Sequence, residues 1–283
     1  MFKSIAAAVL GLSLSLGVWA KTEATQELPP EIKALRWQES GKGEIADKAS
    51  VKIPSGYAFL GEADTSKLLQ AFGNPPSSDH FLIAPKSLDW FAVFSYDETG
   101  YVKDDEKIDA DDLLKSMQSG DKAGNEQRKK LGLEALYTDG WQVPPHYDTA
   151  TKRLEWGLRL RGESGEKNVN YTSRILGRSG VMTATLVSDT ATLAQNTDEF
   201  KKVLAGFDYN SGQTYAEFKN GDKVAAIGLG ALVLGGAAAV ATKKGLWGAI
   251  AGFLAAGWKI IAAAAVALFA GIGKLLGRKK AAE

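Results

Sequence analysis

Six carboxylates lie within nine residues near the middle of the chain, in the stretch GYVKDDEKIDADDLL at residues 100–114. Asp104, Asp105 and Asp109 are the candidate catalytic residues, because neighbouring carboxylates can act as a general acid and base. A calcium loop is disfavoured, since such a loop needs carboxylates at alternating positions around an internal glycine. Asp109 also precedes Asp112 by three residues and an apolar pair follows, the pattern of a helix N-cap with an acidic first turn. Helix capping is therefore the favoured interpretation.

Residues suited to metal or nucleophilic chemistry are scarce in the rest of the chain. It has no cysteine and two histidines, His80 and His146. A thiolate metal site is excluded, and a zinc site would need both histidines together with a carboxylate. The G-x-S-x-G turn of the α/β-hydrolases is absent. We therefore predict no metal site and no cofactor.

Aromatic and arginine side chains are the candidates for ligand binding. Rings beside guanidinium groups could line a groove for a peptide or a glycan. Trp and Tyr can equally fill a core with their polar tips bonded outward, and this is the favoured interpretation. The binding candidates are Tyr101, Arg128, Trp141, Trp156, Tyr171 and Arg174.

The elements that must position these residues predict an α+β fold. Residues 49–60 and 89–102 have the composition of strands, and residues 168–187 predict two strands joined by a turn at Gly177–Gly180. The stretch at 191–209 predicts an amphipathic helix, with Leu193, Phe200, Val203 and Leu204 facing inward. A run of consecutive strands with helices before and after it indicates an antiparallel β-sheet with flanking helices.

Three local features are also predicted. A short helix should begin at Asp64 or Thr65, which could cap it, and end at residues 73–75. Residues 109–133 should form helical segments that break around Gly120–Gly124. The pair Pro144–Pro145 should form a turn that leads into a strand.

The N-terminus resembles a signal peptide. In residues 1–20, Lys3 precedes an apolar stretch, and the small residues Gly17 and Ala20 precede the expected cleavage point. The alternative is an uncleaved signal anchor, and in either case an exported domain is expected at residues 21–222.

Residues 223–283 are expected to anchor the protein in a membrane. Residues 224–242 carry no charge, and their number is close to the ~20 that a bilayer core requires. A second apolar stretch at 246–273 is interrupted by Lys259, and the pattern leaves open whether it is a second span or an interfacial or re-entrant hairpin. The basic residues of this C-terminal region form the cytoplasmic flank expected when the domain lies outside. The anchor is therefore a transmembrane helix or a helical hairpin.

The distribution of charge limits the partners of the domain. Without residues 223–283 and Lys3, the chain has 25 basic and 32 acidic residues. A nucleic-acid binder would instead concentrate positive charge on its folded domain. The expected partners are inner-membrane lipid, an envelope protein, and a second copy of the chain. Self-association would use the Gly/Ala-rich membrane helices, where Gly248 and Gly252 have the spacing of closely packed helix pairs.

Several blocks of the sequence resemble one protein family. They are GYVKDDEKIDADDLL, NEQRKKLG, GWQVPPHYDTATKRLEWGLRL and NYTSRILGRSGVM, supported by the passage FDYNSGQTYAEFKNGDKVAAIGLGALVLGG. The chain thereby resembles the DUF2167 family of predicted membrane-anchored bacterial proteins of unknown function. The resemblance implies an envelope protein with a C-terminal anchor, and it supplies no activity and no site residues. The end of the domain is also similar to a PsbP/Mog1-type sandwich, which is an analogy of fold alone.

The sequence therefore predicts a protein of the bacterial inner membrane with its main domain in the periplasm. The domain is expected to bind another envelope component, and no activity is assigned. The alternative is a membrane-tethered enzyme that uses carboxylates of the Asp104–Asp112 region with Arg128 or Arg174.

Overall fold

The structure is a computed structural model that describes residues 29–71, 78–130, 135–163, 165, 167–188 and 190–235. Residues 29–34 belong to a compact unit of their own, which contains the short helix α1 (Pro30–Lys33). The described residues from Leu35 onward belong to a second unit, to which all that follows refers. The predicted signal peptide and most of the predicted anchor, including the stretch 246–273, lie outside the described residues.

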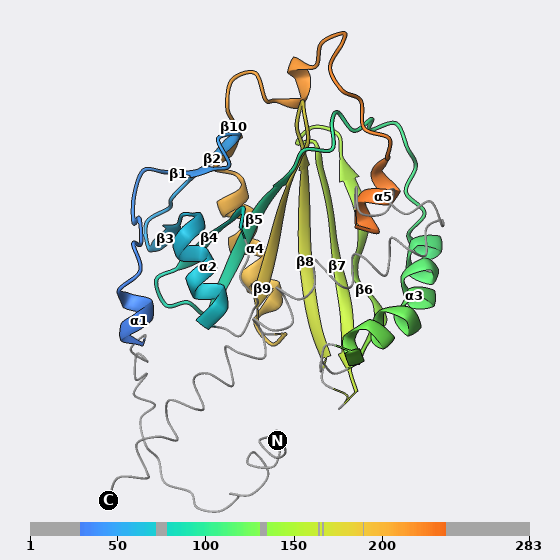
Figure 1. Cartoon of the computed structure of the whole chain (residues 1–283), viewed down its shortest axis with the longest axis horizontal. Coiled ribbons are helices and arrows are strands. Elements are labelled where there is room, and N and C mark those ends of the chain that lie inside the picture. Colours follow the sequence, from blue (N-terminus) through green and yellow to red (C-terminus); the bar gives the residue numbers. More distant parts are fainter. Residues whose placement is uncertain are drawn as a thin grey trace, which may run out of the picture. The chain divides into compact units, whose positions relative to one another are not determined.

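The centre of the second unit is a seven-stranded sheet in the order β3-β4-β5-β9-β8-β7-β6 (Figure 1). Every neighbouring pair is antiparallel, which confirms the predicted class. The strands are β3 (Tyr57–Leu60), β4 (His80–Pro85), β5 (Trp90–Asp97), β6 (Leu136–Asp148), β7 (Arg153–Gly162), β8 (Lys167–Leu176) and β9 (Val181–Ser188).

One face of this sheet, here called the α4 face, packs on helix α4 (Leu193–Leu204) and on a three-stranded sheet. The small sheet has the order β1-β2-β10, from β1 (Lys42–Ile45), β2 (Ala49–Lys52) and β10 (Phe207–Tyr209). The four residues of α4 that were predicted to face inward are all buried there. This core comes from alternating strands and one amphipathic helix, so its periodicity was visible in the sequence.

The opposite face, here called the α3 face, carries α2 (Glu62–Ala71), α3 (Ala110–Lys130) and α5 (Leu229–Val233) (Figure 1). The apolar core on this face joins β7 to α3, to α5 and to a single-turn helix, η1 (Tyr215–Glu217). Helix α2 begins at Glu62, so Asp64 and Thr65 lie inside the first turn and do not cap it. Both are buried; Asp64 pairs with Arg36 and Lys67, and the Thr65 hydroxyl donates to the Leu60 carbonyl.

Helix α3 runs without interruption through Gly120 and Gly124, so the predicted break is wrong. Each glycine costs roughly 1 kcal/mol of helix propensity. Both lie in the buried stripe of the helix with Leu113 and Met117, where tertiary packing outweighs propensity.

Side chains of α3 also bond the backbone of β6, a strand at the edge of the sheet. The Asn125 amide donates to the Leu136 carbonyl at 2.9 Å and accepts from the Leu136 N–H at 2.8 Å. Asp121 accepts from the Thr138 N–H at 2.8 Å. The helix therefore covers an edge that would otherwise be open to pairing with another chain.

The pair Pro144–Pro145 lies within β6 and forms no turn, which corrects the prediction. The register of β6 against β7 shifts between Val143 and His146, where the prolines cannot contribute N–H donors. An edge strand tolerates proline because one of its sides needs no ladder partner. The turn comes later, at residues 149–152.

The predicted span at 224–242 is described only as far as Gly235. Within that part the chain forms the short helix α5, which packs into the core of the α3 face. Among the described residues no helix has the length and apolar character needed to cross a membrane.

Candidate functional site

Four segments that are far apart in the sequence meet at one end of the seven-stranded sheet. They are the loop 98–109 after β5, the β6–β7 turn, the β8–β9 turn, and residues 210–225, here called the strap. Backbone bonds join them: Tyr101 N–H donates to the Lys223 carbonyl at 2.8 Å, and Arg178 N–H donates to the Gln213 carbonyl at 2.9 Å. Each of these segments lies wholly or mostly within a block that carries the family resemblance.

Asp104 is the polar centre of the first cluster. Its Oδ2 accepts hydrogen bonds from the Tyr147 hydroxyl at 2.9 Å and from Lys152 Nζ at 2.8 Å. The side chain of Asp104 is 25% exposed and that of Lys152 is 34% exposed, so the pair lies at the surface but is partly shielded. The carboxylate thus joins the loop after β5 to both sides of the β6–β7 turn.

Aromatic rings surround this pair. Tyr101 stacks on Tyr215 with 4.4 Å between ring centroids and on Phe218 at 4.1 Å. Lys152 Nζ lies 4.9 Å from the centroid of the Tyr215 ring, within the range of a cation–π contact. The Tyr215 hydroxyl donates to the Val102 carbonyl at 2.9 Å. The strap is therefore attached to the loop through rings as well as through its backbone.

The backbone of the β6–β7 turn holds Lys152 in place. Lys152 has φ +54°, the left-handed region in which a residue with a side chain is uncommon. Asp148 Oδ1 accepts from the Ala150 N–H at 2.8 Å and the Thr151 N–H at 3.3 Å, which closes the turn. A glycine would relieve this conformation but would lose the contacts of the lysine with Asp104 and Tyr215.

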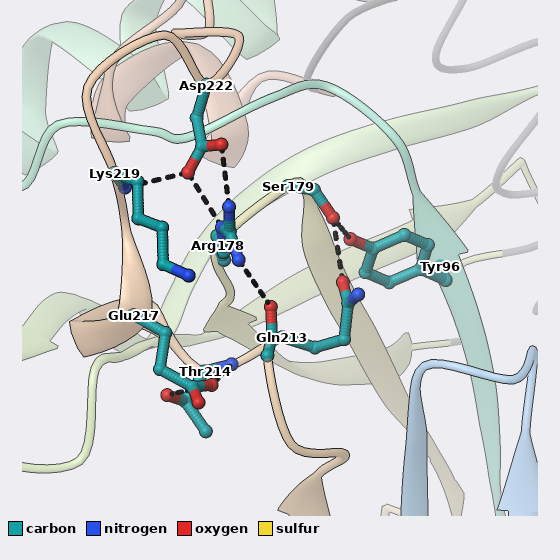
Figure 2. Close-up of polar contacts among 9 residues, drawn as sticks. Tyr96, Arg178, Ser179, Gln213, Thr214, Glu217, Lys219 and Asp222 are labelled. Carbon is teal, nitrogen blue, oxygen red and sulfur yellow. Dashed lines mark hydrogen bonds and ion pairs between the residues drawn. The ribbon is translucent and has the colours of Figure 1, made fainter.

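A second cluster fastens the strap to the β8–β9 turn (Figure 2). The Arg178 guanidinium donates twice to Asp222, at 2.7 Å to Oδ2 and 2.8 Å to Oδ1. Such a two-pronged bond fixes orientation as well as distance. Ser179 Oγ donates to Gln213 Oε1 at 2.9 Å and also bonds the Tyr96 hydroxyl at 2.9 Å.

Protonation at the site follows from these contacts. Burial acts to raise the pKa of Asp104, but hydrogen bonds from Lys152 and Tyr147 outweigh it and lower that pKa. Burial first, and hydrogen bonding second, raises the pKa of Tyr147 and of Tyr215. The hydrogen bonds from Arg178 lower the pKa of Asp222 to about 2. At neutral pH the two carboxylates are therefore charged acceptors and the two phenols are neutral donors.

This arrangement is suited to holding groups in place. A carboxyl group that acts as a general acid at neutral pH needs a raised pKa, and a tyrosine nucleophile needs a lowered pKa. Here the carboxyl pKa of Asp104 is lowered and the phenol pKa values of Tyr147 and Tyr215 are raised. Among the described residues, no group of three or more His, Cys, Asp or Glu side chains could hold a metal ion.

The three candidate catalytic residues have separate environments. Asp104 is the centre of the first cluster. Asp105, next to it, is exposed. Asp109 Oδ1 accepts from the Asp112 N–H at 3.0 Å at the start of α3, which confirms the predicted cap.

The six binding candidates do not form one surface. Tyr171 is buried on the α4 face, whereas Trp156 is buried on the α3 face. Tyr171 pairs with Gly157, the residue after Trp156, and successive residues of a strand point to opposite faces. Trp141 packs beside α3 and donates from its indole to the Ala110 carbonyl at 2.9 Å. Arg128 and Arg174 are buried, and Arg174 lies 3.3 Å from Asp97. Tyr101 alone belongs to the site.

Sequence reasoning did not single out Lys152, Tyr215 or Asp222, three residues of the site. The partners of Asp104 lie 43 and 48 residues away, and Arg178 lies 44 residues from Asp222. No local spacing encodes such pairs. The signal that could have indicated them is that each lies in a block that carries the family resemblance.

Comparisons with known proteins return few matches. No curated protein matches the chain. Among solved structures, the chain is similar to cyanobacterial PsbP (CyanoP) from Synechocystis sp. PCC 6803, with 12% identity and a TM-score of 0.36. The match covers 61% of this chain and 94% of that one, and at this TM-score it carries no information on function. The model of the family "Protein of unknown function (DUF2167)" matches residues 37–269. That range includes all four segments of the site and most of the apolar C-terminal region, and the chain belongs to the DUF2167 family.

Proposed function

We propose that the protein is a membrane-anchored component of the bacterial envelope whose domain binds another envelope component. The binding surface is the end of the sheet formed by the loop 98–109, the two turns and the strap. The observation that supports this most is the convergence of these four segments, which are fixed to one another by Asp104 and Arg178. A surface held in one arrangement loses little conformational entropy when a partner binds.

Groups that a partner could contact lie around the fixed pairs. Lys103, Asp105, Lys219 and Lys223 are exposed, and the rings of Tyr101 and Phe218 are partly exposed. Aromatic rings are enriched at protein interfaces, and exposed charged groups form their polar rim. Membrane anchoring is supported by the apolar, basic C-terminal region, and export by the signal-like N-terminus.

The enzyme alternative gains no support from the described residues. Asp104 is occupied by Lys152 and Tyr147, Asp109 caps α3, and Asp112 pairs with Lys115 at 3.3 Å. Arg174 pairs with Asp97 at 3.3 Å and not with one of these carboxylates.

Site-specific photo-cross-linking in intact cells tests the binding proposal. A photoreactive residue at Lys219, on the strap, should give a discrete adduct of the full-length protein. The same residue at Glu163, exposed at the opposite end of β7, should give none. Arg178→Gln, which releases the strap from the β8–β9 turn, should reduce the adduct. Arg161→Gln, which removes a contact with Asp139 near the far end of β7, should leave it unchanged.

Equal adducts from the two positions, or an adduct indifferent to Arg178→Gln, would place the binding surface elsewhere. Anchoring is tested separately by washing membranes with alkaline carbonate. The full-length protein should remain in the membrane fraction, and its release would overturn the membrane part of the proposal.

A further inference from the structure

The short helix α5 is buried as deeply as any part of the core. Leu229 is 1% exposed, Leu232 and Val233 are 0% exposed, and Leu234 is 4% exposed. They pack on the α3 face with Leu113 and Met117 of α3 and with the apolar residues of β7. These residues lie in the first two thirds of the uncharged stretch 224–242, which sequence alone predicts to cross a membrane.

Specific contacts fix the chain as it enters α5. Val224 pairs with Tyr101 in a parallel bridge, and Ala225 N–H donates to the Tyr101 carbonyl at 2.8 Å. Glu106 then accepts from the Gly230 N–H at 3.2 Å. A Cβ atom on Gly228 would lie 1.9 Å from Glu106 Oε2, so the side chain of Glu106 packs directly against the backbone of Gly228 and would have to move to admit one.

We infer that residues 224–235 are a constituent of the folded domain and that the membrane anchor begins beyond Gly235. This inference rests on the anchoring in the proposed function. Withdrawing the segment into a bilayer would leave the apolar side of α3 and β7 facing water. Burial of these Val and Leu side chains in the domain stabilises the docked position of α5, and transfer to lipid would replace that gain only while exposing the domain core to water.

The length of the uncharged stretch that remains after Gly235 also supports this inference. Residues 236–242 number seven, and as a helix they would extend about 10 Å, a third of the ~30 Å hydrocarbon core. Residues 236–242 are therefore too few to span a bilayer by themselves.

A disulfide in the full-length protein tests whether α5 is docked. The chain has no cysteine, so every introduced thiol is unique. The Cβ position of Gly228 lies 3.7 Å from Glu106 Cβ, which is within the range for a disulfide. Glu106→Cys with Gly228→Cys should form the bond in membranes on mild oxidation. Glu106→Cys with Gly61→Cys should not, because a Cβ on Gly61 has no atom within 4 Å. A free 106–228 pair would overturn the inference.

Alkylation of Val233→Cys separates burial in the domain from burial in lipid. In intact membranes a water-soluble maleimide should not react with it. Urea that unfolds the domain should make it react almost completely, while Ala263→Cys in the stretch 246–273 stays protected. A thiol at 233 that stays protected in urea would lie in the bilayer and overturn the inference. Release by carbonate would instead defeat the anchoring proposal, and the result with urea would still report on α5.

Discussion

The two faces of the seven-stranded sheet bury apolar cores of different construction. On the α4 face, regular strands and one amphipathic helix supply nearly all of the buried residues. On the α3 face, the core also includes Val102 from a loop, Tyr215 from the strap and the residues of α5. The polar clusters around Asp104 and Arg178 lie beside these irregular segments.

The difference shows how irregular segments can complete a core. A helix satisfies most of its own backbone and a strand bonds its neighbours in the sheet, whereas a loop needs side-chain and irregular cross-segment bonds to stay in place. Stability of the α3 face should therefore depend on residues near its polar rim and in the C-terminal part of the domain. Stability of the α4 face should depend on apolar packing.

The largest expected effect tests whether the short helix α5 contributes as much to the stability of the domain as the regular helix α4. Leu232→Ala on the α3 face and Leu204→Ala on the α4 face each truncate a fully buried leucine. Both should lower the free energy of unfolding by about 2–5 kcal/mol. Urea denaturation of the purified full-length protein in mild detergent measures this. A loss for Leu232→Ala far below that for Leu204→Ala would break the equivalence of the two cores.

A smaller effect should come from the polar rim. Asp104→Asn removes the charge that pairs with Lys152 and weakens the bond from Tyr147, and it should cost about 1–2 kcal/mol in this partly exposed setting. The neighbouring exposed carboxylate gives a matched control, since Asp105→Asn should change stability by less than about 0.5 kcal/mol. The same urea experiment compares the two variants. Equal losses in the free energy of unfolding would mean that the contacts of Asp104 do not stabilise the domain.

The smallest effect is a dependence on pH at the strap. The Asp222 pKa is lowered from 3.8 to about 2, so its pairing with Arg178 stabilises the fold fully above pH 3.8 and is lost as the pH falls through about 2. The wild-type protein should thus melt at a higher temperature than Asp222→Asn at neutral pH. Melting followed by circular dichroism should show this gap closing between pH 4 and pH 2. If the difference in melting temperature stayed constant over this range, the ion pair between Asp222 and Arg178 would not be what stabilises the strap.

Local patterns in the sequence were enough for the regular elements. The β8–β9 hairpin, the inward residues of α4 and the cap at Asp109 were predicted because each depends on residues a few positions apart. Predictions failed where a local signal competed with packing. Gly120 and Gly124 predicted a break, but the buried side of α3 accommodates them, and the prolines of β6 are tolerated because that strand lies at an edge.

What the sequence determined by itself is the antiparallel α+β class, the charge balance and the family. Tertiary structure decided the site, because Asp104, Lys152 and Tyr215 come from segments whose proximity no local spacing records. It also decided the role of α5. An apolar stretch has the same pattern whether it faces lipid or a protein core, and only the contacts of Leu232 and Val233 with the α3 face distinguish the two.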